Sequence, residues 1–77
     1  MECYKNLSGN SGVAAYAIGD DFIWVQFSDG TRYQYTYDRP GIVHVETMKQ
    51  LAIGGRGLNS YIQRTPVVRK GYFIKER

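Results

Sequence analysis

The chain has 77 residues, of which 43% are hydrophobic and 14% aromatic, and its formal net charge is +3. This length predicts one domain with a small core and modest stability, and no apolar run reaches the roughly 18 residues that a membrane-spanning helix needs. The N-terminus lacks the apolar segment of a signal peptide, and the one cysteine, Cys3, has no partner for an internal disulfide, so we expect a cytoplasmic protein.

The first part of the chain predicts a flexible segment followed by a strand. Residues 1–12 are mostly polar and are expected to form a flexible N-terminus. Residues 13–18 form an apolar run between two glycines, and a turn at Asp20-Asp21 would pair this strand with the next one. The expected cross-strand pairs are Ile18 with Ile23, Tyr16 with Val25, and Ala14 with Phe27.

A second turn, at residues 28–30, predicts a hairpin whose register decides the two faces of the sheet. Asp-Gly between alternating apolar residues is a strong hairpin signal. A two-residue loop would mix apolar and polar side chains on one face. A three-residue loop, with Gly30 left-handed in a bulge, places Val25 opposite Tyr33 and Ile23 opposite Tyr35 and so gathers apolar residues on one face. We therefore predict the three-residue loop.

The rest of the chain predicts helices that cover this apolar face. Asp38-Arg39-Pro40 supplies a cap residue and a proline near a first helical turn. One helical stripe is then formed by Ile42, Val45, Met48, Leu51 and Ala52. Glycines at residues 54–57 end this helix, a short second helix follows and ends before Thr65-Pro66, and residues 67–74 are expected to be extended.

The predicted class is α+β. The expected architecture is a three-stranded antiparallel meander packed against one main helix plus a short second helix, with an extended basic C-terminal segment. The expected division is a flexible N-terminus at 1–12, a domain at 13–64 and the basic extended segment at 65–77.

A family resemblance accompanies this architecture. The pattern is Phe27-x-x-Gly30-x-x-Tyr33-x-Tyr35, then Pro40, a helix, and Gly57-Leu58-Asn59-x-x-Ile62. It resembles the KTSC domain family, short domains found at the C-terminus of some lysyl-tRNA synthetases and as free-standing bacterial proteins. The resemblance covers about residues 13–62 and departs from the family's usual pattern between Pro40 and Ala52, where the helix is longer. It implies mainly structural roles for the motif residues, an RNA-binding role proposed for the family, and no catalytic residue.

The charge distribution points to the C-terminal third. Residues 1–55 hold four basic and six acidic side chains, whereas residues 56–77 hold six basic side chains and one acidic one. Basic residues interleaved with aromatic ones suit nucleic acid, because cations neutralise phosphates and rings stack on bases. The candidate RNA-binding residues in this third are Arg56, Arg64, Arg69, Lys70, Tyr72 and Lys75. The alternative is a solubilising tail whose charges protect an edge strand.

Trp24 and Arg32 complete the candidate RNA-binding residues, and Trp24 is the second clue to function. In the predicted register it lies on the outer face of the sheet near Arg32, where it could stack a base, bind a protein partner, or simply cover neighbouring alanines. Tyr33 and Tyr35 are predicted to point inward and pack in the core.

No pattern in the sequence predicts a reaction. His44 has no second histidine at ligand spacing, and no serine or cysteine has a recognisable base, so neither a metal, a cofactor nor an enzyme activity is expected. We interpret the chain as a non-enzymatic binding module whose partner is RNA, either tRNA or single-stranded. The alternative is a protein–protein interaction domain that uses the Trp24 face.

Overall fold

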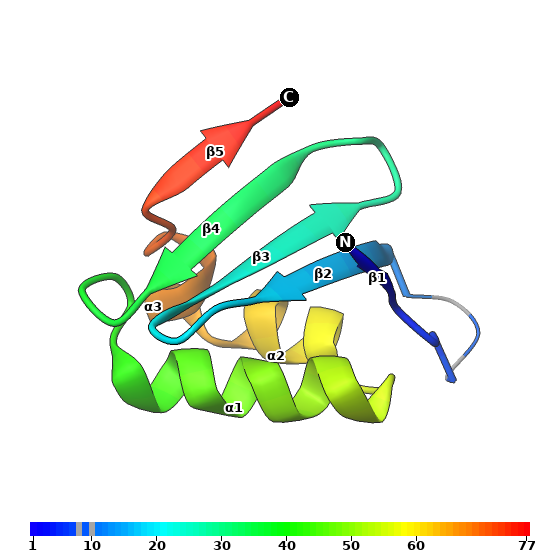
Figure 1. The fold of residues 1–77 in the computed structure, drawn as a ribbon, viewed down its shortest axis with the longest axis horizontal. Coiled ribbons are helices and arrows are strands. Elements are labelled where there is room, and N and C mark those ends of the chain that lie inside the picture. The colour runs from blue at the N-terminus through cyan, green and yellow to red at the C-terminus, as the bar shows by residue number, and fades with distance from the viewer. Residues whose placement is uncertain (8, 10) are drawn as a thin grey trace.

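The computed structural model describes residues 1–7, 9 and 11–77. Within these residues the chain is α+β, as predicted, with five strands in one antiparallel sheet and three helices beneath one of its faces (Figure 1). The strands are β1 (Glu2–Cys3), β2 (Val13–Ile18), β3 (Phe22–Phe27), β4 (Arg32–Thr36) and β5 (Ile74–Glu76). The helices are α1 (Ile42–Gly54), α2 (Leu58–Arg64) and α3 (Pro66–Arg69). The order of the strands across the sheet follows their order in the chain.

The core lies between the sheet and the helices. The sheet contributes side chains that point toward the helices, and each helix contributes at least one buried residue. The largest fully buried side chains are those of Tyr35, Ile23, Met48, Leu58, Val25, Val45 and Val68. No helix in the described part of the chain is long and apolar enough to span a membrane.

The β3–β4 hairpin confirms the predicted three-residue loop. Ile23 pairs with Tyr35 and Val25 pairs with Tyr33. The amide of Gly30 donates to the carbonyl of Phe27 at 2.9 Å, and Gly30 has a φ of +91°. This positive φ favours glycine, because a Cβ atom clashes with the backbone in that conformation.

We predict that Gly30→Val destabilises the protein by more than about 1 kcal/mol, measured by urea unfolding. A Cβ at Gly30 would meet no heavy atom of other residues within 4 Å. The expected loss of stability therefore comes from strain in the local backbone and not from a clash with neighbouring side chains. Gly54→Ala is the control, since Gly54 also has open space around it but ends a helix without a positive φ. A Gly30→Val protein as stable as the parent would contradict the loop assignment.

The β2–β3 pairing confirms part of the prediction and corrects one pair. Ile18 pairs with Ile23 and Tyr16 with Val25, as expected. The expected pairing of Ala14 with Phe27 is wrong, because the register shifts between residues 13 and 15 and Val13 takes the place opposite Phe27. This bulge buries the larger apolar side chain of Val13 and leaves Ala14 exposed.

Helix α1 begins later than predicted, and its buried face contains Val45, Met48 and Ala52 of the predicted stripe. It starts at Ile42 after Gly41, so the expected role of Asp38 as a cap residue is wrong. Ile42 is 53% exposed instead of lying in the core stripe, and Lys49 is buried beside the apolar residues. The predicted C-terminal end is confirmed, since Gly55 is left-handed and its amide donates to the carbonyls of Leu51 and Ala52.

Buried Lys49 ties helix α1 to the sheet. Its Nζ donates to the carbonyl of Asp20 at 2.9 Å and lies 2.8 Å from Oε2 of Glu46. The hydroxyl of Tyr37 donates to the same Glu46 oxygen at 2.6 Å. The ammonium group is therefore paired and hydrogen-bonded, which is the condition under which a buried charge is tolerated.

This network predicts a pH-dependent stability. Hydrogen bonds from Lys49 and Tyr37 hold the pKa of the Glu46 carboxyl below its usual 4.5. The stability that they add is present above pH 4.5 and is lost as the pH falls through the lowered pKa. We expect Glu46→Gln to be less stable than the parent in urea at about pH 7, and the difference to shrink below about pH 4.5.

The control for this experiment is Glu2→Gln, which removes an exposed carboxylate that forms no ion pair among the described residues. Its stability difference from the parent should be small throughout. A Glu46→Gln difference that stays constant down to about pH 3 would contradict the role given to this carboxylate.

Residues near both ends of the chain form strands of the sheet, whereas the sequence predicted a flexible N-terminus and an extended C-terminal segment outside it. In the segment 1–12, expected to be flexible, β1 pairs with β2 and Tyr4 is 6% exposed, although positions 8 and 10 lie outside the described residues. The prediction of an extended stretch at 67–74 is wrong for residues 67–69, which belong to α3, where Val68 is fully buried. Strand β5 follows and adds a fifth strand beside β4. The sheet is therefore wider than the expected three strands.

Candidate functional site

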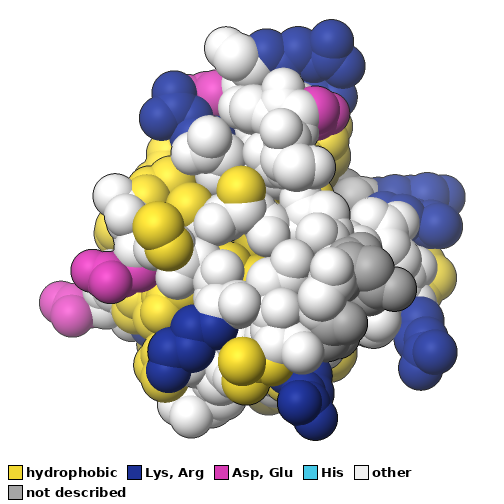
Figure 2. Space-filling view, turned by 90° about the vertical axis from the view of Figure 1, so that its right-hand side faces the viewer, with side chains coloured by type: hydrophobic (Ala, Val, Ile, Leu, Met, Phe, Trp, Pro, Cys, Tyr) yellow, Lys and Arg dark blue, Asp and Glu magenta, His cyan; other side chains and the backbone are white. Residues whose placement is uncertain are grey.

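The candidate residues predicted from sequence lie in separate regions of the molecule. Figure 2 shows the side that carries the β1–β2 connection and the β3–β4 turn, where Lys and Arg side chains stand at separate places around the outline. The Lys and Arg side chains visible on this side therefore do not form a single patch.

Trp24 and Arg32 lie on the outer face of the sheet, away from the helices. Trp24 is half-buried and stands between Ala17 on β2 and Gln34 on β4. Arg32 lies opposite Glu76 on β5, and its Nη2 is 3.2 Å from Oε1 of that residue. Because Glu76 partly neutralises Arg32, this face offers an aromatic ring and little free charge.

Arg56 lies apart from the other candidates, in the exposed loop between α1 and α2. Its neighbour Gly55 packs against the side chain of Lys5, since a Cβ at Gly55 would meet the Lys5 Cβ. Arg64 and Lys70 are exposed at the ends of α2 and α3.

Tyr72 and Lys75 gather around Tyr33. Tyr33 contacts Phe27 edge-on at 5.5 Å between ring centroids and Tyr72 at 5.0 Å. The Nζ of Lys75 lies 5.6 Å from the centroid of the Tyr33 ring, because Lys75 stands opposite Tyr33 in the β4–β5 pairing. These contacts hold the Tyr33 ring and a cation together at the edge of the sheet.

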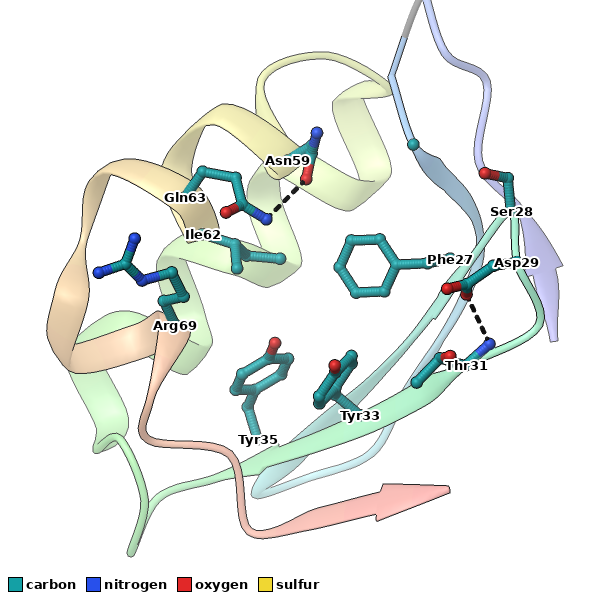
Figure 3. Close-up of a pocket in the computed structure, with 11 residues that line it drawn as sticks. Phe27, Ser28, Asp29, Thr31, Tyr33, Tyr35, Asn59, Ile62, Gln63 and Arg69 are labelled. Carbon is teal, nitrogen blue, oxygen red and sulfur yellow. Dashed lines mark hydrogen bonds between the residues drawn. The ribbon is translucent and has the colours of Figure 1, made fainter. Parts of the chain in front are cut away.

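A pocket of about 390 Å³ opens between this edge and the helices (Figure 3). We call it the β4–α2 pocket. Its apolar walls are Phe27, Tyr33 and Ile62, and Tyr35 lies deeper. Arg69, from α3, stands at one end, and Asp29, from the β3–β4 loop, stands at the other.

The polar edge of the pocket comes from α2. Asn59 and Gln63 are one turn apart, and Nε2 of Gln63 donates to Oδ1 of Asn59 at 3.5 Å. Arg69 forms no ion pair with any described residue. The carboxylate of Asp29 accepts the amide of Thr31 at 2.9 Å, and this hydrogen bond lowers the pKa of Asp29. One end of the pocket is therefore cationic and the other anionic.

The hydroxyl of Tyr35 is the most unusual group in the pocket. The residue is 1% exposed, yet its hydroxyl has no hydrogen-bond partner among the described residues. No fully enclosed side-chain oxygen or nitrogen of those residues lacks a partner, so this hydroxyl reaches the pocket surface, as Figure 3 shows. Burial, with the nearby Tyr33 and Tyr72, raises the pKa of Tyr35, so the group remains a protonated donor.

Several residues that carry the family resemblance meet at this pocket. Phe27, Tyr33, Tyr35, Asn59 and Ile62 all line it. Sequence reasoning gave these residues structural roles and did not single out Gln63 or Asp29. The spacing of Asn59, Ile62 and Gln63 places the three on one face of a helix, and this was the signal that could have grouped them.

No group of three His, Cys, Asp or Glu side chains among the described residues could hold a metal ion. The Nδ1 atom of His44 lies 2.7 Å from the hydroxyl of Tyr61, which joins α1 to α2. Comparisons with protein-family models, with curated proteins and with solved structures found no match to this chain.

We predict that Tyr35→Ala costs on the order of 3 kcal/mol of unfolding free energy, because it removes a fully buried ring. Tyr35→Phe should cost less than about 1 kcal/mol, since the hydroxyl has no partner to lose. Urea unfolding measures both variants. A Tyr35→Ala protein as stable as the parent would show that this ring is not part of the core.

Proposed function

We propose that the protein is a non-enzymatic RNA-binding module, with Tyr33, Arg69 and Lys75 at the centre of its contact surface. The observation that carries the proposal is the arrangement of these three residues: the Tyr33 ring lines the pocket and packs against the Nζ of Lys75, and Arg69 lines the same pocket from α3. Single-stranded nucleic acid binds to surfaces of this kind, where cations follow the phosphates and rings or pockets receive the bases.

The fold holds the basic C-terminal segment in place against the rest of the protein. The basic segment is not a loose tail, because α3 is anchored by buried Val68 and β5 is paired with β4. Cations held in place lose less conformational entropy when a ligand binds than cations on a flexible chain. Six basic residues against one acidic residue in segment 56–77 supply the attraction for phosphate.

The resemblance to KTSC domains supports the same proposal, since an RNA-binding role has been proposed for that family. With it we propose a bacterial, cytoplasmic setting, in keeping with the single cysteine, Cys3. The expected partner is tRNA or another RNA with single-stranded regions.

Fluorescence anisotropy with labelled single-stranded RNA across a salt series tests this function. We expect binding by the parent at low salt. In the double variant Arg69→Gln/Lys75→Gln, affinity should fall and the slope of log affinity against log salt should decrease by about 1.4, because each phosphate contact to a single strand contributes about 0.7.

The matched control is Lys5→Gln/Arg56→Gln, which removes two charges at the far end of α1. This variant should keep the parent's slope. If both double variants lose RNA affinity equally, RNA is attracted by the net charge of the protein and not by a defined site. A parent protein that binds no RNA at low salt would overturn the proposal.

A second function, recognition of a protein partner, is favoured by the outer face of the sheet. No helix of the described residues covers this face, and Trp24 lies at its middle. The same titration separates the two functions. If Trp24→Ala keeps RNA affinity while the Arg69/Lys75 variant loses it, the outer face is not needed for RNA and stays available for a protein.

A further inference from the structure

We propose that the β4–α2 pocket binds the base of one unstacked nucleotide, with the Tyr35 hydroxyl donating a hydrogen bond to an acceptor on that base. This inference deepens the proposed function and rests on it, because it states which part of an RNA strand enters the pocket. It begins from the Tyr35 hydroxyl, which reaches the pocket surface and has no hydrogen-bond partner among the described residues.

The first argument comes from the Tyr35 hydroxyl. It has no partner among the described residues, yet it is not fully enclosed and reaches the pocket surface. A ligand that fills the pocket excludes water from this hydroxyl, so the ligand itself must supply the hydrogen bond. Burial raises the pKa of Tyr35, so the hydroxyl stays protonated and can donate to an acceptor on the ligand. An aliphatic ligand would leave it unsatisfied, whereas a base carbonyl or ring nitrogen would satisfy it.

The second argument is the shape and chemistry of the walls. A volume of about 390 Å³ lies at the lower end of the range for small-molecule sites. Phe27, Tyr33 and Ile62 provide apolar surfaces for a flat ring. Along the α2 edge, Asn59 and Gln63 carry amide donors and acceptors, which are the groups that read the edges of unpaired bases.

The third argument is the separation of charge along the pocket. Arg69 lies at one end of the pocket, and its guanidinium group suits a phosphate outside that end, which it can bind through parallel hydrogen bonds. The Asp29 carboxylate at the other end repels an anion. The pocket therefore suits a base with one phosphate on the Arg69 side, a unit found both in an RNA strand and in a free nucleoside monophosphate.

The test is a titration of the isotope-labelled protein, followed by backbone amide chemical shifts. Uridine 5′-monophosphate, whose base carries carbonyl oxygens, should shift the amides of Thr31, Tyr33 and Gln63. Ribose 5-phosphate, which has the same phosphate and no base, should leave these amides unshifted. Equal effects of the two ligands would show phosphate binding without a base and would overturn the inference.

Two variants locate the base contact. Tyr35→Phe keeps the ring and should weaken binding of uridine 5′-monophosphate about five- to tenfold, the effect of one lost hydrogen bond. Gln63→Met, at an exposed position where folding is not at risk, should also weaken it. The control is Tyr61→Phe, which removes a hydroxyl directed at His44 and should keep the parent's affinity. Parent affinity in both Tyr35→Phe and Gln63→Met would overturn the inference.

Single-stranded RNA, titrated in parallel, distinguishes the two proposals. Weaker binding of both RNA and the mononucleotide by Tyr35→Phe supports an RNA base in the pocket. Mononucleotide binding without RNA binding overturns the RNA function and assigns the pocket to a free nucleotide. RNA binding that Tyr35→Phe leaves unchanged, with no mononucleotide shifts, overturns the pocket inference and keeps the RNA function.

Discussion

The β3–β4 turn is the constraint on which the rest of the molecule depends. Its left-handed Gly30 sets a three-residue loop, and that loop sets which side chains of β4 face the helices. A slip of one residue would send Tyr33 and Tyr35 to the open face and bring Arg32 and Gln34 against the core. The apolar layer, the pocket and the position of Lys75 opposite Tyr33 all require this one register.

Core and candidate site share residues in this small domain. Tyr35 is among the largest fully buried side chains, and its hydroxyl also belongs to the pocket surface. The C-terminal segment likewise has two roles, since Val68 completes the core while neighbouring Arg69 lines the pocket. A chain of this length has few residues to spare for a separate site, so the edge of the core becomes the binding surface.

Patterns that extend over several residues were readable from the sequence, and short or irregular ones were not. The hairpin register followed from keeping apolar and polar residues on different faces, and the end of α1 followed from its glycines. The bulge at Ala14 was not predictable, because alternation in an almost wholly apolar run does not locate an extra residue. Two-residue β1 and four-residue α3 are too short to show a period. The pocket needed the structure, because its residues come from elements that are distant in the chain.

Strand β5 is short, and this affects how firmly Lys75 is held over the Tyr33 ring. This strand has three residues, lies at the edge of the sheet and pairs on one side with β4. Separating it from β4 breaks few hydrogen bonds, so this opening costs far less than global unfolding. Amide protons of β5 should therefore exchange with solvent sooner than those of central β3. Each such opening lifts Lys75 from the Tyr33 ring, which lines the pocket, while the core stays folded.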